Sequence, residues 1–313
     1  MLQKHKYIQV RGVPASGKTT LARLLHRHIL EVETDPFVVY LEVWRRQDTT
    51  VSELWRDWLS KHGFRFQAGS ILIVDEAQTS YYEQGFWLTL KNINDSCPFL
   101  VITFASHGSA GQNLEHTISP FRIRQEQNVS LLRRDFGDGV SIGLFLSRRE
   151  FNSLISRSGN YDVFDATFLD YIYDVTNGHV GACCDVLRAV QKHPSFHSIG
   201  NSGNRYSYKT FTTRISTDEL MENLRGLTLF VRGLPFQHEL QEPDIAMVFQ
   251  KVLENGSIVV WQPSEDPSLQ ECFHEGWLHN EPVGRSDGPV AYTFATPLHR
   301  RYVQWMLLNI PDI

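Results

Sequence analysis

The stretch Gly12-Val13-Pro14-Ala15-Ser16-Gly17-Lys18-Thr19 decides the fold of this chain, because it matches the pattern G-x-x-x-x-G-K-[ST] at every fixed position. This pattern, the P-loop, is specific when a strand precedes it and a helix follows it. Residues 7–10 (Tyr-Ile-Gln-Val) predict a short buried strand, and residues 20–29 predict a helix. Apolar residues recur at helical spacing in this stretch, and one face of the helix carries Leu21, Leu24, Leu25 and His28. Both flanks therefore favour a P-loop over a chance turn rich in glycine and serine.

Each residue type in this stretch has a physical role in holding a nucleotide. Gly12 and Gly17 let the backbone curl so that successive N–H groups point at phosphate oxygens. The helix behind them adds the positive end of its dipole. Lys18 is expected to reach the β- and γ-phosphates, and the Thr19 hydroxyl is expected to ligate Mg²⁺. The sequence thus predicts that ATP and Mg²⁺ are bound by Gly12, Pro14, Ala15, Ser16, Gly17, Lys18, Thr19 and Thr20.

The composition is that of an ordinary globular protein. Of 313 residues, 42% are hydrophobic and 21% are charged, so two or three domains are expected and disorder is not. Four cysteines without C-x-x-C spacing favour reduced thiols over a zinc or redox site. No apolar run approaches the roughly 20 residues of a membrane span. With no room for a signal peptide before the first strand, an intracellular protein of the cytoplasm or nucleus is expected.

Strand and helix signals alternate through the first 140 residues. Expected strands after the P-loop cover residues 37–44, 70–75, 99–105 and 128–132, and expected helices cover residues 51–62 and 82–95. Such alternation predicts a parallel sheet with helices on both faces, which is the core of a P-loop NTPase at residues 1–140.

Beyond residue 140 the strand signals stop, and three helices are expected at residues 148–157, 164–175 and 180–193. Ser147 and Glu150 form a capping box at the first of them. We interpret residues 141–195 as a helical lid. Residues 196–217 are rich in Ser, Asn, Gly, Thr and Tyr, and we interpret them as a linker or long surface loop.

The last unit, residues 218–313, mixes helices with short strands. Helices are expected at residues 244–254, 267–275 and 298–309, a short strand at 257–261, and a two-stranded wing from 277–279 and 291–295. This order suggests a winged helix. The unit holds six Arg and Lys against fourteen Asp and Glu, a net charge of −8, which disfavours nucleic acid because phosphate contacts dominate that affinity. A protein partner, self-association or an intramolecular role is expected instead.

A second motif completes the expected site. Four apolar residues, 71–74, run into Asp75-Glu76 at the end of a strand. Asp75 is expected to hold Mg²⁺ with Thr19, directly or through water, and Glu76 to act as general base on the attacking water. The alternative is an Asp-Glu pair that caps a helix.

Further candidates carry weaker patterns. Thr103 and Ser106 end the fourth strand, where some NTPases carry a polar sensor of the γ-phosphate; Thr103 is otherwise an ordinary strand former. Gly178-His179 opens a lid helix, so His179 either faces the nucleotide or caps the helix. Candidates for an arginine finger, with surface or structural roles as the alternative, are Arg122, Arg124, Arg133 and Arg134.

In this order the motifs resemble the AAA+/STAND branch of P-loop ATPases, and more closely the NTPase module of Crinkler-type (CRN-like) proteins of fungi and oomycetes. The likeness is carried by residues 11–21, Asp75-Glu76-Ala77-Gln78 with Tyr81 and Trp87, 176–181, 276–279 and 294–299, and it covers nearly the whole chain. It implies ATP hydrolysis with Mg²⁺ and a regulatory or switch role. An N-terminal header and a nuclease- or kinase-like effector domain, frequent in that family, have no counterpart here, so effector toxicity is not carried over. The Gly-His motif continues with Val180, where STAND proteins commonly have proline.

The sequence therefore predicts a nucleotide-dependent switch that hydrolyses ATP. Three alternatives stay open. A small-molecule or nucleotide kinase would use the same P-loop, and a nucleotide-holding interaction module would bind without turnover. A DNA-processing ATPase is disfavoured by the acidic C-terminal unit.

Overall fold

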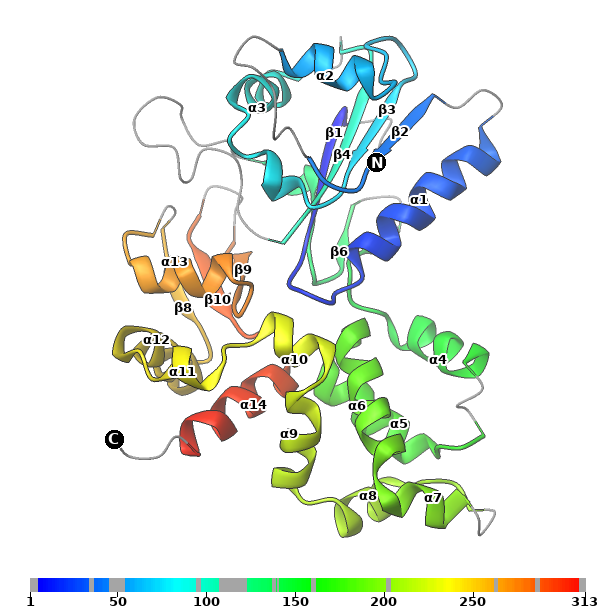
Figure 1. Ribbon diagram of the computed structural model, residues 1–313, viewed down its shortest axis with the longest axis vertical. Helices are drawn as coiled ribbons and strands as arrows, with labels where there is room; N and C mark the ends of the chain where they lie inside the picture. The colour runs from blue at the N-terminus through cyan, green and yellow to red at the C-terminus, as the bar shows by residue number, and fades with distance from the viewer. Residues whose placement is uncertain are drawn as a thin grey trace. The chain divides into compact units, whose positions relative to one another are not determined.

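A computed structural model describes residues 5–33, 37–44, 54–93, 97–106, 123–136, 139, 141–158, 162–200, 204–261, 264–284 and 288–309. The chain divides into two compact units (Figure 1). The sheet unit comprises residues 1–12 and 17–143, and the helical unit comprises residues 13–16 and 144–313. The four residues at the tip of the P-loop thus belong to the helical unit, although both of their flanks belong to the sheet unit.

The sheet unit is built on five parallel strands in the order β2-β3-β4-β1-β5. They are β1 (Tyr7–Arg11), β2 (Val38–Leu41), β3 (Ile71–Val74), β4 (Leu100–Ala105) and β5 (Asn128–Val129). The other described elements are α1 (Lys18–Val32), α2 (Trp55–Lys61), α3 (Gln84–Lys91), the 3₁₀ turns η1 (Ala77–Ser80) and η2 (Gln125–Gln127), and an antiparallel pair β6 (Arg134–Asp135) and β7 (Ser141–Ile142). The mixed α/β fold with a helix-flanked parallel sheet, predicted from the sequence, is confirmed.

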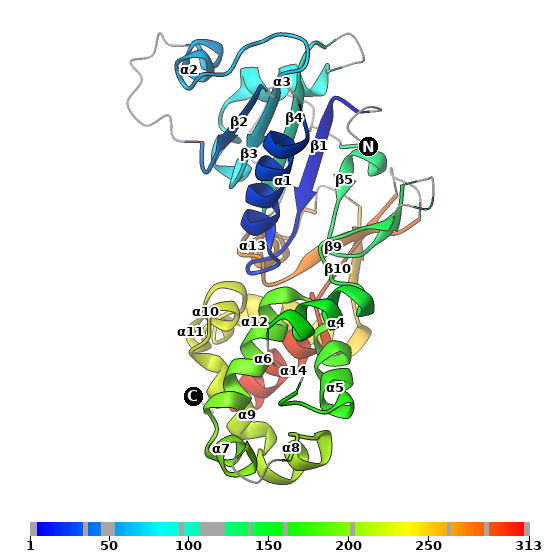
Figure 2. The same cartoon turned by 90° about the vertical axis from the view of Figure 1, so that its right-hand side faces the viewer.

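Both faces of the sheet are covered. Tyr7 and Leu72 pack with residues of α2 and α3 in an aromatic core, where Trp44 lies 4.7 Å from Trp58 and 4.6 Å from Phe86 between ring centroids. On the opposite face α1 lies along β2 and β4 (Figure 2). Because both faces are covered, β2 (Val-Val-Tyr-Leu) and β3 (Ile-Leu-Ile-Val) are apolar at every position rather than alternating.

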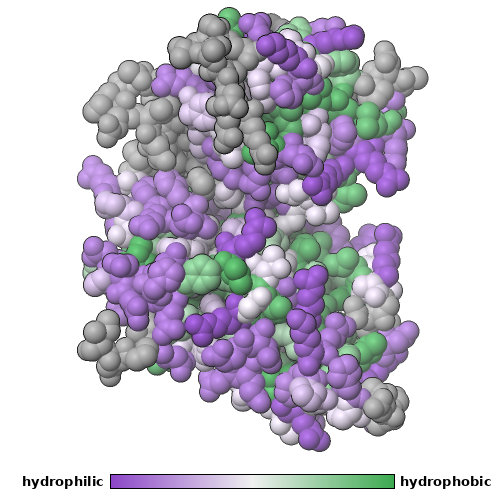
Figure 3. All heavy atoms as spheres, viewed as in Figure 1, coloured by the Kyte–Doolittle hydropathy of each residue, from purple (hydrophilic) through white to green (hydrophobic). Residues whose placement is uncertain are grey.

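The face that α1 turns inward differs from the one that apolar spacing suggests. Its buried residues include Ala22 and Ile29, whereas Leu21 and Leu24 are exposed. The small Ala22 side chain lets the helix approach the sheet. Exposed hydrophobic residues are not confined to this helix, because Figure 3 shows hydrophobic areas scattered over an otherwise hydrophilic surface.

The helical unit holds eleven helices among its described residues. They are α4 (Arg148–Arg157), α5 (Ala166–Thr176), α6 (Val180–Lys192), α7 (Pro194–Gly200), α8 (Tyr208–Arg214), α9 (Thr217–Arg225), α10 (Thr228–Gly233), α11 (Gln237–Leu240), α12 (Pro243–Asn255), α13 (Pro267–His274) and α14 (Pro297–Leu308). Three antiparallel strands accompany them, in the order β8-β10-β9: β8 (Ile258–Val260), β9 (His279–Pro282) and β10 (Val290–Thr293). The expected pairing of the last two strands is confirmed, and β8 joins them.

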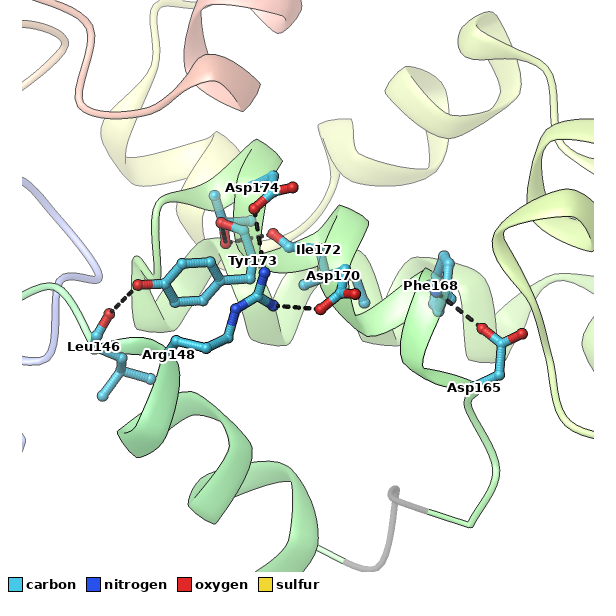
Figure 4. A network of polar contacts seen from close by, with 9 residues as sticks. Leu146, Arg148, Asp165, Phe168, Asp170, Ile172, Tyr173 and Asp174 are labelled. Atoms are coloured by element: carbon cyan, nitrogen blue, oxygen red, sulfur yellow. Dashed lines mark hydrogen bonds and ion pairs between the residues drawn. The ribbon is translucent and has the colours of Figure 1, made fainter.

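The first helices of this unit lie where the sequence predicts them. The Ser147–Glu150 capping box is present at α4, and the Asp165 side chain caps α5. Figure 4 shows how the two helices are linked. The Arg148 guanidinium lies 4.1 Å from the Tyr173 ring centroid and forms ion pairs of 2.9 Å with Asp170 and 3.3 Å with Asp174. These pairs are largely exposed, so the packing on the tyrosine ring is the more durable part of the link.

Residues 196–217 are not the linker or loop that their polar composition suggests. They contain most of α7 and all of α8, which begins at a Ser207 cap. Tyr206 and Phe211 are buried in the core of the helical unit. In a stretch with few aliphatic residues, these aromatic side chains provide the apolar surface that is buried in the core.

No helix in the described part of the chain has the length and apolar character needed to cross a membrane.

Candidate functional site

The P-loop leads from β1 into α1 through two residues in the left-handed region, Ala15 (φ 58°) and Gly17 (φ 92°). Gly12 extends the sheet, because its N–H donates to the Ala105 carbonyl at 3.2 Å. The Lys18 ammonium group donates to the Gly12 carbonyl at 2.6 Å. The lysine is therefore held within the loop, where its charge faces the curl of the backbone.

Two features of the loop fit a bound phosphate. The left-handed conformation of Ala15 costs about 1–3 kcal/mol for a residue with a Cβ, and such strain gathers at ligand sites. The Ser16 hydroxyl is buried and has no hydrogen-bond partner among the described residues. A buried hydroxyl without a partner is destabilising, and a phosphate oxygen in the loop is the group that would satisfy it.

Asp75 follows β3 at the edge of the sheet where the P-loop leaves β1, with β4 between the two strands. Only 1% of Asp75 is exposed. Burial raises the pKa of its carboxyl, while hydrogen bonds from the Thr19 side chain and the Glu76 N–H and the charge of Lys18 lower that pKa. The structure thus brings together Lys18, Thr19 and Asp75.

The Asp75 carboxylate and the Thr19 hydroxyl suit Mg²⁺. This ion binds one or two protein carboxylates and takes its remaining ligands from water and substrate phosphates. The carboxylate and the hydroxyl fit a metal that arrives with a nucleotide, whose phosphates and water supply the remaining ligands. Among the described residues, no group of three or more His, Cys, Asp or Glu is arranged to hold a metal.

Glu76 has the left-handed conformation (φ 46°, ψ 43°) and makes no side-chain cap to the 3₁₀ turn that follows. Its carboxylate instead accepts a hydrogen bond from the Gln78 amide, whose oxygen accepts the Ser106 N–H at 3.2 Å. The capping alternative is therefore not what holds this side chain. Gln78, which lies in η1 and is held by the backbone N–H of Ser106 just after β4, orients Glu76.

Sequence reasoning assigned no role to Gln78 or to Tyr40, whose hydroxyl donates to Asp75 at 3.4 Å. The Tyr40 ring stacks on His26 at 5.5 Å between centroids. Gln78 stands within the quoted acidic motif, so its spacing from Glu76 was a usable signal. Nothing in the sequence marks Tyr40, because its place depends on the pairing of β2 with β3.

Thr103 lies in β4, and its expected sensor role stays a prediction. It is fully buried, and its hydroxyl lies 3.0 Å from the Tyr7 hydroxyl. Among the candidate arginines, Arg133 donates to the Ser141 carbonyl at 2.6 Å, which holds β6 to β7. Arg134 lies in β6, Arg124 is exposed, and Arg122 lies outside the described residues.

His179 caps α6, as the alternative interpretation has it, by accepting the Ala182 N–H on Nδ1. The side chain is 0% exposed and packs on Phe145 and His299. This geometry agrees with the capping alternative, and the nucleotide contact expected of His179 stays a prediction. The residue of this motif that reaches the P-loop is Gly181, whose N–H donates to the Ala15 carbonyl at 3.1 Å.

Replacing Asp75 by asparagine should weaken Mg²⁺-dependent nucleotide binding by about ten- to a hundredfold and raise the Tm of the nucleotide-free protein. The raised pKa means that the folded protein holds this proton more tightly than the unfolded chain does. The ionised carboxylate therefore opposes folding at neutral pH, and the opposition disappears as the pH falls below the unfolded value of about 3.9.

Thermal melts at several pH values and calorimetry with MgADP check both expectations. The gain in Tm should shrink as the pH is lowered towards 4. Asp57→Asn, at an exposed aspartate of α2, is the control. Unchanged Mg²⁺-dependent binding in Asp75→Asn would remove this residue from the site.

No family model and no curated protein matches the chain. Among solved structures it is similar to RuvB of Thermotoga maritima, with 17% identity, a TM-score of 0.37, and coverage of 91% of this chain and 84% of that one. It is also similar to Drosophila ORC bound to DNA (14%, 0.37, 96% and 82%) and to Aeropyrum pernix ORC1 in complex with DNA (14%, 0.39, 98% and 87%). We take no function from likenesses at this level.

Proposed function

We propose that this chain binds ATP with Mg²⁺ and hydrolyses it, as a nucleotide-dependent switch of the AAA+/STAND type. One observation carries the proposal: Lys18, Thr19 and the buried Asp75 meet at one edge of a parallel sheet, beside a glutamate that a neighbouring amide orients. The P-loop supplies backbone N–H groups for the phosphates.

The side chains divide the chemistry between them. Lys18 exchanges its hydrogen bond to the Gly12 carbonyl for a phosphate oxygen, and Thr19 and Asp75 would hold the metal. Bound Mg²⁺ would neutralise negative charge on the phosphates. Glu76 accepts the proton of the attacking water, and Gln78 keeps its carboxylate in one orientation.

Glu76 favours hydrolysis over the two main alternatives. A kinase needs a base for its acceptor and a pocket for that acceptor, and a nucleotide-holding module needs neither. The left-handed conformation of Glu76 is strained, and the hydrogen bond from Gln78 fixes the orientation of its carboxylate. A nucleotide-holding module would need neither feature. The partner is proposed to be a protein or a second copy of this chain, because the net charge of −8 after residue 217 opposes DNA phosphates.

Steady-state phosphate release by the purified chain tests the proposal. We expect turnover of ATP that requires Mg²⁺ and is abolished by EDTA. Parallel reactions with GTP measure base preference, and reactions with candidate acceptors measure transfer to something other than water. Release of ADP only when an acceptor is present would indicate a kinase, and binding of nucleotide without phosphate release would indicate a holding module.

A further inference from the structure

The tip of the P-loop rests on three glycines of the helical unit. Gly181, in the first turn of α6, donates its N–H to the Ala15 carbonyl. Gly276 follows α13 and approaches the Pro14 ring, and Gly233 ends α10 beside the same proline. All these contacts lie within one compact unit, because residues 13–16 belong to it.

No side chain fits at the closest two of these positions. A Cβ on Gly276 would lie 2.6 Å from Pro14 Cδ, and one on Gly181 would lie 2.6 Å from Ala15 Cβ and 2.7 Å from its carbonyl oxygen. Contacts under 3.0 Å force one partner to shift. At Gly233 the corresponding distance to Pro14 Cβ is 3.3 Å, which is tight but tolerable.

Two other glycines of the same unit, which have no such neighbour, serve for comparison. A Cβ added at Gly256 or Gly226 would meet nothing within 4 Å. Gly256 has φ 79° and Gly276 has φ 77°, so both adopt the conformation that favours glycine. Only Gly276 also has a neighbour that excludes a methyl group.

We propose that Gly181, Gly233 and Gly276 form a seat that sets the conformation of the P-loop, so that nucleotide binding and the packing of the helical unit are coupled. The inference rests on the proposed nucleotide binding and names how that site is regulated. The seat holds Pro14 and Ala15, including the strained Ala15 backbone, in the curl that presents N–H groups to phosphate. By linkage, a nucleotide that selects this curl also stabilises the seat, and a partner that disturbs the seat weakens nucleotide binding. The glycines are positioning residues, because they act through the loop.

The test compares MgADP affinity, measured by calorimetry, in Gly276→Ala and Gly256→Ala. Both substitutions force alanine to nearly the same positive φ, so the difference between them reports mainly the collision with Pro14. We expect Gly276→Ala to bind about tenfold more weakly than Gly256→Ala, equivalent to about 1.4 kcal/mol. Equal affinities in the two variants would overturn the seat.

A suppressor distinguishes the seat from general damage. Pro14→Ala removes Cγ and Cδ, the atoms that a Cβ on Gly276 would strike. In a double-mutant cycle, it should restore most of the affinity lost in Gly276→Ala. It should not restore Gly181→Ala, which strikes Ala15 instead. Equal rescue of both variants would overturn the proposal.

Folding is followed in every variant by thermal melts. If Gly276→Ala alone does not fold, a folded and MgADP-binding Pro14→Ala/Gly276→Ala protein supports the seat, and a double variant that remains unfolded overturns it. Measurements on the parent protein distinguish this inference from the proposed nucleotide binding on which it rests. A parent that does not bind MgADP overturns both, whereas a parent that binds, with equal losses at positions 256 and 276, overturns only the seat.

Discussion

Glu76→Gln should keep nucleotide affinity and lose hydrolysis, by the roughly 10²–10⁴-fold that general-base catalysis contributes. Glutamine preserves the size of the side chain and its hydrogen bonding to Gln78, but its amide cannot accept a proton from water. A fall in kcat without a matching loss of affinity is the signature of a group that acts in the transition state.

The measurement pairs calorimetry with single-turnover hydrolysis of ATP. Glu254→Gln, at an exposed glutamate of α12, is the control and should behave like the parent. Unchanged hydrolysis in Glu76→Gln would end the assignment of the base. Loss of binding in that variant would instead give Glu76 a role in holding the nucleotide or the metal.

Lys18→Ala should remove most of the nucleotide affinity while the fold persists. The lysine supplies the one charge that the P-loop pattern places on the β- and γ-phosphates, and hydrogen bonds to a charged group are worth about 1.5–3 kcal/mol, or roughly ten- to a hundredfold in affinity. The side chain also donates a hydrogen bond to the Gly12 carbonyl, within the same loop, and the thermal melt of the variant measures what its loss costs the fold.

Calorimetry with MgADP and a thermal melt with and without nucleotide measure the effect. The stabilisation by nucleotide seen in the parent should vanish in the variant, since a ligand stabilises only the protein that binds it. Lys251→Ala, at an exposed lysine of α12, should retain it. Parental affinity in Lys18→Ala would mean that the phosphates lie elsewhere.

The parts of the site that sequence predicts are those whose geometry is local. Lys18 and Thr19 follow the glycine loop directly, and Asp75 and Glu76 end a strand, so spacing along the chain fixes both pairs. That these pairs meet depends on β4 lying between β1 and β3. Helices α4, α5 and α6 could also be predicted from the sequence, because their apolar residues recur at helical spacing and polar residues cap their N-termini.

What the sequence does not reveal depends on contacts between distant residues. Gln78 orients Glu76 only because the end of β4 lies beside η1. Thr103 is a candidate sensor because it is polar, but the sequence does not reveal that its hydroxyl lies 3.0 Å from the Tyr7 hydroxyl on the neighbouring strand β1. Helices α9, α10 and α11 were missed because each is short, and short helices are stabilised by packing more than by their own pattern. The sequence singles out the His179 side chain, whereas the contact with the P-loop is made by the backbone N–H of Gly181, two residues later.

The membership of residues 13–16 in the helical unit has a consequence for biosynthesis. The P-loop leaves the ribosome before the glycines on which its tip rests, which are spread from position 181 to position 276. At about 5–20 residues per second, translation needs some tens of seconds between the loop and the last of them. On the proposed seat, a nascent chain would assemble its sheet long before its phosphate loop acquires its final conformation. The growing polypeptide would then engage nucleotide in the mature way only after Gly276 has been made.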